Sequence, residues 1–318
     1  MKRFLCNIIL FLFVALVGYG LLVSLLGGTG LLRNVNFRLG NYGHLASRVQ
    51  EAADTYPILL DNQITDHSSQ VTHNVDVLFL GSSHAYRTFD TRFYDSCGLK
   101  TFNLGSSNQT PLQTYVLLQR YLDGLNPKMV VFEVHPDILT NDGVEGAVDM
   151  LSNVPVTCAM TRMAWTMHNA KVFNTWIYAV AHRRKIKNFV EDSIVDGFAY
   201  VKGGFVETDD VPFQPVAQPP MEIKLDARQM NALRDCLSLL HQRNIPYMLV
   251  EVQGSKVLRD SYTNHADFEA AMRQLGDYHY TVLPMSDSLH FYDEDHLNKA
   301  GIKMFNEYFI GELSKSDQ

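Results

Sequence analysis

The stretch VDVLFLGSSH, residues Val75–His84, decides the fold class. Its first part, VDVLFL, is a short β-branched run that ends in glycine, as expected for a strand buried on both faces. Two later runs have the same character, MVVFEV at Met129–Val134 and YMLVEV at Tyr247–Val252. Helix-like segments separate the runs, so the sequence predicts an α/β domain whose mostly parallel sheet is covered on both faces.

Two helix starts lie between these strands. Thr110, with Pro111 next and Gln113 at the third position, is typical of a capped helix that begins with proline. Asp226 with Gln229 opens a second predicted helix, in which apolar residues recur at intervals of three and four. Its apolar side holds Met230, Leu233, Cys236, Leu237 and Leu240, so we expect Cys236 to be buried.

A segment from about residue 138 to 221 interrupts the alternation of strands and helices. It contains a helical-looking piece at Met160–Val190 and a proline-rich exit at Pro212–Pro220. We therefore expect a helical insertion in the domain. The densest basic run of the chain lies in it, and we expect that run to form one solvated helix face. The run consists of Arg183, Arg184, Lys185 and Lys187.

The N-terminus reads as a membrane anchor. Lys2 and Arg3 precede an apolar run, Phe4–Leu26, which is long enough to span a bilayer and longer than the apolar core of a cleavable signal. An uncleaved signal anchor at residues 1–33 is the prediction, and a cleaved signal is the alternative. Residues 34–70 are polar and are expected to be a stem that leads to a domain at 71–318. The flanking charges favour an extracytoplasmic domain.

Composition excludes several classes of protein. The chain has 318 residues, 46% of them hydrophobic, so it can bury a full core. Its formal net charge of -7 provides no positive field for phosphates, and we expect no nucleic-acid partner. The four cysteines are scattered without a CxxC motif, which indicates neither a zinc site nor a disulfide framework. No cofactor is expected.

Ligands of a parallel sheet bind beyond the carboxyl ends of its strands, so residues that follow the apolar runs are the candidates for chemistry. The first run is followed by a tight turn, Gly81–His84, that would present the hydroxyl of Ser83. A serine there acts as a nucleophile only with a base for its proton and donors for the oxyanion. Alone, the tetrapeptide is more typical of an ordinary glycine-serine turn.

Two further segments complete the candidate site. Asn103–Asn108 (NLGSSN) offers a glycine for close backbone approach and an asparagine side chain as donor. Near the C-terminus, Asp293 and His296 are three residues apart, a spacing that suits the carboxylate and the imidazole base of a triad. An apolar-periodic helix follows them. A divalent metal site is the alternative for this loop, with His290, Asp293, Asp295 and His296 as ligands.

In this order the segments resemble the SGNH (GDSL-like) hydrolase superfamily over about Val75–Phe309, and the run DEDHLNKAG is the most specific match. The resemblance implies a flavodoxin-like three-layer sandwich. It implies that Ser83 is the nucleophile and an oxyanion donor, that Gly105 is the second donor, and that Asp293 and His296 complete the triad. Two positions depart from the family: Ser82 replaces the usual aspartate, and the third block lacks its asparagine. Asn108 and His135 are the candidates for the missing donor.

The same features resemble membrane-anchored relatives that move acyl groups on surface polymers, such as the proteins of alginate O-acetylation and of teichoic acid D-alanylation. This resemblance implies a serine esterase or acyl-transfer enzyme that acts on esters, O-acetyl esters above all, of cell-surface carbohydrate. Its partners would be the membrane, the acylated polymer and other envelope biosynthesis proteins. The altered third block leaves an alternative, a non-catalytic carbohydrate-binding or assembly component.

Overall fold

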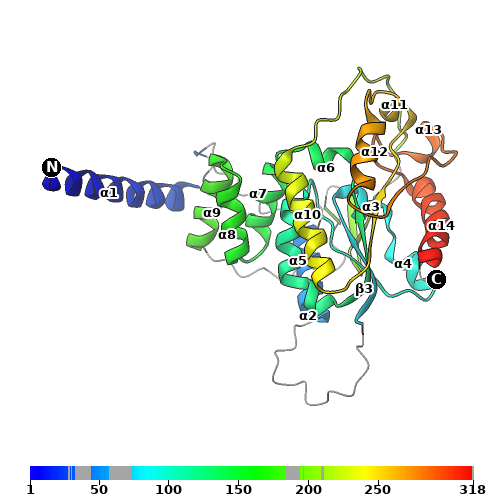
Figure 1. Ribbon diagram of the computed structural model, residues 1–318, viewed down its shortest axis with the longest axis horizontal. Coiled ribbons are helices and arrows are strands. Elements are labelled where there is room, and N and C mark those ends of the chain that lie inside the picture. Colours follow the sequence, from blue (N-terminus) through cyan, green and yellow to red (C-terminus); the bar gives the residue numbers. More distant parts are fainter. Residues whose placement is uncertain are drawn as a thin grey trace, which may run out of the picture.

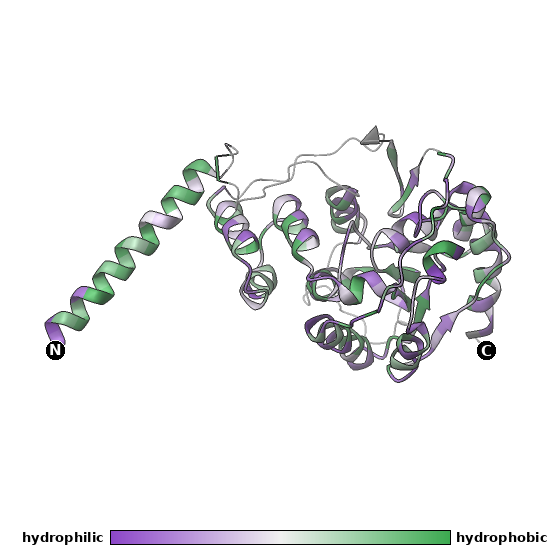
Figure 2. Ribbon diagram, turned by 90° about the horizontal axis from the view of Figure 1, so that it is seen from above, coloured by the Kyte–Doolittle hydropathy of each residue, from purple (hydrophilic) through white to green (hydrophobic). Residues whose placement is uncertain are grey.

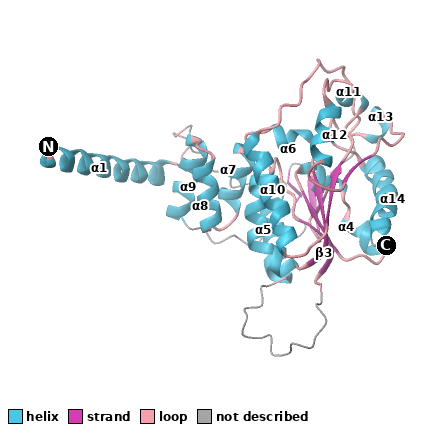
Figure 3. Cartoon of the chain, in the orientation of Figure 1, coloured by secondary structure: helices cyan, strands magenta, loops and turns pink. Residues whose placement is uncertain are grey.

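The computed structural model describes residues 1–27, 29, 31–32, 44–56, 73–182, 194–195, 197–208 and 211–316. In this part of the chain the structure is an α/β fold with a five-stranded central sheet and an apolar N-terminal helix (Figure 3). The predicted fold class is confirmed at this level.

The central sheet consists of β1 (Val75–Leu80), β2 (Thr101–Asn103), β3 (Pro127–Glu133), β7 (Tyr247–Glu251) and β8 (Tyr278–Tyr280). The strand order is β2-β1-β3-β7-β8, and each neighbouring pair is parallel. The three apolar runs form β1, β3 and β7, as predicted. The edge strands β2 and β8 are not predicted from the sequence. Each has only three residues, which is too few to show an alternation of apolar and polar side chains.

The first face of the sheet packs against α2 (Leu45–Thr55), α5 (Pro111–Leu125), α7 (Val144–Asn153), α8 (Cys158–Thr166), α10 (Ala227–Gln242) and α12 (His265–Arg273). Both predicted helix starts are confirmed. Thr110 and Gln113 form a capping box at α5, and the Asp226 side chain accepts the first N–H groups of α10. Cys236 is fully buried on α10, as expected.

The second face packs against α3 (Ser83–Thr88), α4 (Thr91–Ser96) and α14 (Lys299–Ser316). Phe79 of β1 stacks on Phe89 with ring centroids 4.3 Å apart, and Phe89 in turn contacts Phe305 and Phe309 of α14. Burial of each such ring stabilises the fold by about 1.5–3 kcal/mol. This aromatic cluster therefore holds α3 and α14 on one face of β1. Three short helices follow strand ends, α6 (Pro136–Thr140), α11 (Lys256–Arg259) and α13 (Asp287–His290).

The expected insertion contains more than helices. Its helical part includes α7, α8 and α9 (Ala170–His182). A second, antiparallel sheet follows, made of β4 (Ile194–Val195), β5 (Phe198–Val201) and β6 (Phe205–Thr208). The turn of this sheet joins the central sheet because the Asn103 N–H donates to the carbonyl of Gly203 at 2.7 Å. The basic run at 183–187 lies outside the described residues.

The N-terminal helix α1 (Lys2–Leu26) extends away from the rest of the molecule (Figure 1) and is apolar over most of its length (Figure 2). It is long and apolar enough to cross a membrane, and most of its side chains are exposed. Its C-terminal part contacts α9, where the Tyr19 hydroxyl donates to Asn174 at 2.6 Å. The insertion therefore lies next to the C-terminal end of α1.

The structure differs from the predicted stem at residues 34–70. Within that range α2 packs into the core, with Leu45 and Val49 almost fully buried. Leu45, Val49 and Ala52 recur at intervals of four and three, but a helix this short gives a weak pattern among polar neighbours. Tertiary contacts with α5 and α7 therefore decide its position.

Candidate active site

The turn after β1 presents Ser83 at the carboxyl edge of the sheet. Gly81 has a φ of 139°, and a Cβ atom there would lie 2.8 Å from the Cβ atom of Glu133, so only glycine fits. The Oγ atom of Ser82 then accepts the N–H of His84 and caps α3. Ser83 is consequently the first residue of α3 and is only partly buried, which leaves its hydroxyl accessible.

The structure brings together the three predicted triad residues. The Nε2 atom of His296 lies 2.8 Å from the Oγ atom of Ser83. The Nδ1 atom of the same ring lies 2.9 and 3.0 Å from the two carboxylate oxygens of Asp293. With the proton on Nδ1, Nε2 accepts the Ser83 hydroxyl. Hydroxyl, imidazole and carboxylate in this order can remove the hydroxyl proton and so activate an oxygen nucleophile.

Local hydrogen bonds shape the loop that carries the base. Asp293 Oδ1 accepts the backbone N–H of His296 at 2.7 Å and that of Asp295 at 3.2 Å, which closes a tight turn. Phe291 and Leu297, both buried, pair across this turn and anchor it to the second face of the sheet. The three-residue spacing of Asp293 and His296 therefore holds the ring against its carboxylate.

The predicted oxyanion donors differ in their surroundings. Gly105 packs against the turn before Ser83, since a Cβ atom on it would lie 2.9 Å from the carbonyl oxygen of Ser82. Its N–H donates to the side chain of Asn103 at 3.0 Å. Asn108 is exposed, with a φ of 48°. His135 is buried, and its Nδ1 atom accepts the Asp137 N–H, which puts the proton of the neutral ring on Nε2 and makes that atom a donor.

The fold adds three residues to this site. Sequence analysis singles out neither His84 nor Glu133, and it gives Asp295 only as an alternative metal ligand. The rings of His135 and His84 stack with centroids 3.9 Å apart, and those of His84 and His296 with centroids 4.7 Å apart. Glu133 is fully buried and accepts the N–H of His135 at 2.6 Å. The sequence did offer a signal for Glu133, which is the glutamate near the end of the apolar run MVVFEV. A carboxylate that is buried in such a run rarely stays ionised without a partner.

Burial and charge shift the pKa values of these groups. Burial raises the pKa of Glu133 to about 7 and lowers that of His135. Burial alone would lower the pKa of His296, but the hydrogen bonds to Asp293 and Asp295 outweigh it and raise that pKa. For Asp295, burial opposes ionisation, yet the hydrogen bonds of His296 and His84 hold its pKa well below the usual range. The hydrogen bonds of His296 to these carboxylates therefore favour the protonated form of its ring.

Arg87 adds a buried positive charge one helical turn after Ser83. Its side chain is 5% exposed and lies over the ring of Tyr292, 4.6 Å from the centroid, and near that of Phe198. Its Nε and Nη2 atoms have no hydrogen-bond partner among the described residues. Residues four apart share a helix face, so this charge lies on the side of α3 that carries Ser83. Its field opposes protonation of His296.

The predicted metal ligands are only partly together. His84, Asp295 and His296 offer ligand atoms that all lie within 4.8 Å of one another. His290, by contrast, is hydrogen-bonded to Ser286 through its Nδ1 atom. The cluster thus includes His84, which the loop sequence alone does not contain.

No protein-family model matches the chain. A search of the curated proteins likewise finds no match. A functional proposal for this chain therefore depends on the geometry of its site and on the motifs of its sequence.

Proposed function

We propose that the chain is a membrane-anchored serine esterase or acyl-transfer enzyme that acts through an acyl-Ser83 intermediate. The observation that carries the proposal is the hydrogen-bonded series Ser83 Oγ, His296 Nε2 and Asp293, with a half-buried hydroxyl at one end and a carboxylate at the other. Such a series serves proton abstraction from an oxygen nucleophile.

In the proposed reaction the Ser83 oxygen attacks the carbonyl carbon of an ester, and its proton passes to Nε2 of His296. The resulting oxyanion is held by backbone N–H groups, first that of Ser83, which has no intrahelical acceptor in the first turn of α3. When the intermediate collapses, the C–O bond to the alcohol breaks and His296 returns the proton to the leaving oxygen. Water or a sugar hydroxyl then attacks the acyl-enzyme, which distinguishes hydrolysis from transfer.

The remaining oxyanion donor is assigned within the same proposal. His135 is joined to the triad through its stack on His84 and presents Nε2–H as a donor, whereas Asn108 is a solvent-exposed turn residue. We favour His135 for this reason. The N–H of Gly105 donates to Asn103, so its part in the reaction requires release of that hydrogen bond.

Fold and motifs support an SGNH-type assignment. The sheet order β2-β1-β3-β7-β8 corresponds to strands 2-1-3-4-5, the flavodoxin-like order. Ser83 follows the first strand and the Asp293–His296 loop precedes the last helix, as the resemblance to SGNH hydrolases implies. The apolar helix α1 supports a membrane location, and we place the domain outside the cytoplasm with an acyl ester of surface carbohydrate, O-acetyl above all, as substrate.

A fluorophosphonate probe tests the proposal. The full-length chain in detergent would be labelled, and the modified residue mapped by mass spectrometry, with Ser83→Ala and His296→Ala as test variants. Ser96→Ala, which removes an exposed hydroxyl on α4, is the matched control. We expect labelling at Ser83 in the wild type and in the control, and none in either test variant. A folded wild-type protein that resists labelling contradicts the proposal and favours a binding or assembly role in an envelope polysaccharide system.

A further inference from the structure

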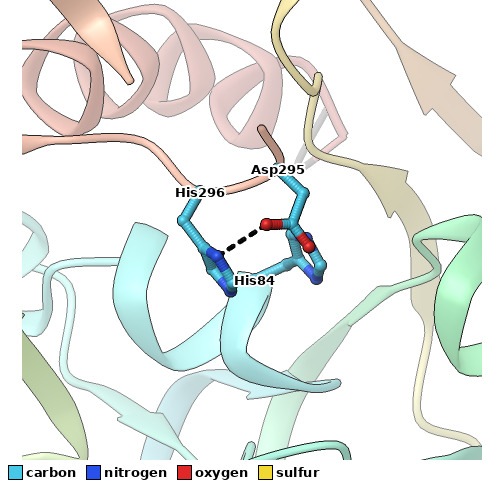
Figure 4. Close-up of side chains that lie close together, drawn as sticks. All are labelled: His84, Asp295 and His296. Atoms are coloured by element: carbon cyan, nitrogen blue, oxygen red, sulfur yellow. Dashed lines mark ion pairs between the residues drawn. The ribbon is translucent and has the colours of Figure 1, made fainter. Parts of the chain in front are cut away.

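Asp295 lies between two imidazole rings. One carboxylate oxygen, Oδ1, is 2.8 Å from Nδ1 of His296, and the other, Oδ2, is 3.3 Å from Nε2 of His84. Figure 4 shows the carboxylate directed toward His296 with the His84 ring alongside. The side chain of Asp295 is 25% exposed and that of His84 is 4% exposed, so little water competes for these contacts.

On the side away from Asp295, the His84 ring contacts two buried polar residues in series, Ser82 and Glu133. Its Nδ1 atom is 3.0 Å from Oγ of Ser82, and that oxygen is 3.4 Å from Oε2 of Glu133. If Glu133 is protonated, its proton goes to Ser82 Oγ, the hydroxyl donates to Nδ1, and the neutral ring carries its proton on Nε2. If Glu133 is ionised, the hydroxyl donates to it and His84 donates from Nδ1 to Ser82 Oγ. The first arrangement turns an Nε2–H group toward Asp295 Oδ2 at the ion-pair distance of 3.3 Å.

The Asp293 carboxylate also binds the backbone of its own loop. Its Oδ1 atom accepts two backbone N–H groups of the loop in addition to the His296 ring. Asp295 Oδ1, at 2.8 Å, is the nearest carboxylate oxygen to Nδ1 of His296. When His296 takes the Ser83 proton, the positive charge that forms on the ring is thus faced by two carboxylates.

We propose that Asp295 is a second orienting carboxylate for His296, and that His84, held by Ser82 and Glu133, positions Asp295. The inference rests on the proposed function, because it assigns positioning residues to the same base. His84 and Asp295 act through His296 and do not touch the reacting atoms.

The stacked rings make a shared metal ion a poorer explanation of the same cluster. The planes of His84 and His296 are 8° from parallel with centroids 4.7 Å apart. A metal binds imidazole in the plane of the ring, about 2.0 Å from the nitrogen. An ion between two nearly parallel, offset rings would lie out of the plane of at least one of them. A carboxylate can approach each ring with a different oxygen, as Asp295 does.

Several charged groups surround His296 and enter its titration. Asp293 and Asp295 lie on its own loop, and His84 and Arg87 face it from α3. Behind His84 lie Glu133 and His135, and the Tyr262 hydroxyl lies within range of the Asp295 charge. A variant of Asp295 must therefore be compared with a neighbouring carboxylate that does not contact the ring. Glu294, which accepts a hydrogen bond from Gln218, is that control.

The test uses the full-length chain in detergent and two readouts. The first is the rate of fluorophosphonate labelling at Ser83 against pH for Asp293→Asn, Asp295→Asn, the double variant and Glu294→Gln. We expect Asp295→Asn to slow labelling about tenfold or more and to shift its pH midpoint downward, because the ring loses an anion that favours its protonated form. The double variant should lose more than either single change, and Glu294→Gln should match the wild type.

The second readout is the pKa of His296, followed by NMR of protein with labelled histidine, and it does not depend on labelling of Ser83. His84→Phe keeps a ring in the stack and removes the donor to Asp295, whereas His84→Gln keeps a donor. We expect a lower His296 pKa in Asp295→Asn and His84→Phe and a smaller change in His84→Gln. An unchanged His296 pKa in folded Asp295→Asn overturns the inference. Addition of Zn²⁺ tests the metal alternative, and zinc-induced loss of the His84 and His296 signals at micromolar metal would overturn it too.

If the wild type is not labelled at all, the proposed function fails while the NMR readout still decides the role of Asp295. If the wild type is labelled and Asp295→Asn behaves like Glu294→Gln, the proposed function stands and the further inference fails. The two failures are therefore distinguishable.

Discussion

The Nε2 atom of His296 lies 2.8 Å from the Oγ atom of Ser83, although 213 positions separate the two residues in the chain. One residue begins the helix after the first strand, and the other lies in the loop before the last helix. Their meeting at one edge of the sheet links the two ends of the domain.

The rate of labelling at Ser83 should rise with pH along a single-histidine curve whose midpoint lies above 6.5, because only neutral His296 accepts the proton and its pKa is raised. Labelling rates measured between pH 5 and 9 check this. The exposed His241, changed to glutamine, should leave the curve in place. A midpoint at or below 6.5 would contradict the two-carboxylate environment of the ring.

The raised pKa of His296 also predicts how this residue affects the stability of the fold at different pH values. A pKa raised by folding means that the folded protein binds the proton more tightly than the unfolded chain does. The contribution of His296 is therefore complete below pH 6.5 and is lost as pH rises through the raised pKa. Thermal unfolding of His296→Gln should differ most from wild type in acid. A difference that grows toward alkaline pH would show that the sign is wrong.

Glu133→Gln should remove a second pH dependence of stability, which arises from the ionisation of Glu133. Burial raises the Glu133 pKa from 4.5 to about 7, so the folded state binds more protons than the unfolded state between these values. Wild-type stability then falls as pH rises through this window, by about 3 kcal/mol in total, and the neutral amide escapes that loss. Unfolding temperatures from pH 4.5 to 8 should show the variant gaining on the wild type. Parallel curves would mean that Glu133 ionises as freely as an exposed glutamate.

Arg87→Met should stabilise the fold and impair the site. The Arg87 guanidinium is buried without a carboxylate partner in the described structure, and a methionine of similar length would remove the desolvation cost. We expect a gain of about 1 kcal/mol in the free energy of unfolding and slower labelling of Ser83. Arg92→Met is the matched control, since Arg92 is half-exposed and paired with Asp90 and Glu207. Loss of stability in Arg87→Met would indicate that its contacts with Tyr292 outweigh its burial.

Gly105→Ala should destabilise the turn that carries Ser83. The added methyl group would lie 2.9 Å from the Ser82 carbonyl oxygen and 3.1 Å from that of Gly81, and backbone atoms cannot rotate away. The expected cost is about 1–3 kcal/mol, with loss of labelling. Gly311→Ala on α14 is the control, because nothing lies within 4 Å of its added methyl and alanine favours the helix. Equal unfolding temperatures for the two variants would show that the turn relaxes.

The sequence identified the parts of the site that share a local pattern. Asp293 and His296 were predicted as partners because three residues on a turn bring a carboxylate to its own imidazole, and the loop forms this contact. Ser83 was predicted because a glycine turn follows a buried strand. The proposed role of His84 cannot be predicted from local sequence, because it depends on Asp295, which is remote in the chain. Glu133 was passed over because it lies inside an apolar run.

By itself the sequence determined the three central strands, the capped starts of α5 and α10, and the long apolar helix α1, since each is encoded by neighbouring residues. Only the tertiary structure decided that α2 joins the core, that β2 and β8 form the sheet edges, and that His84, Asp295 and Glu133 surround the base. The physical reason is that strand order and helix packing set distances between remote residues. Local propensity and periodicity carry no information about those distances.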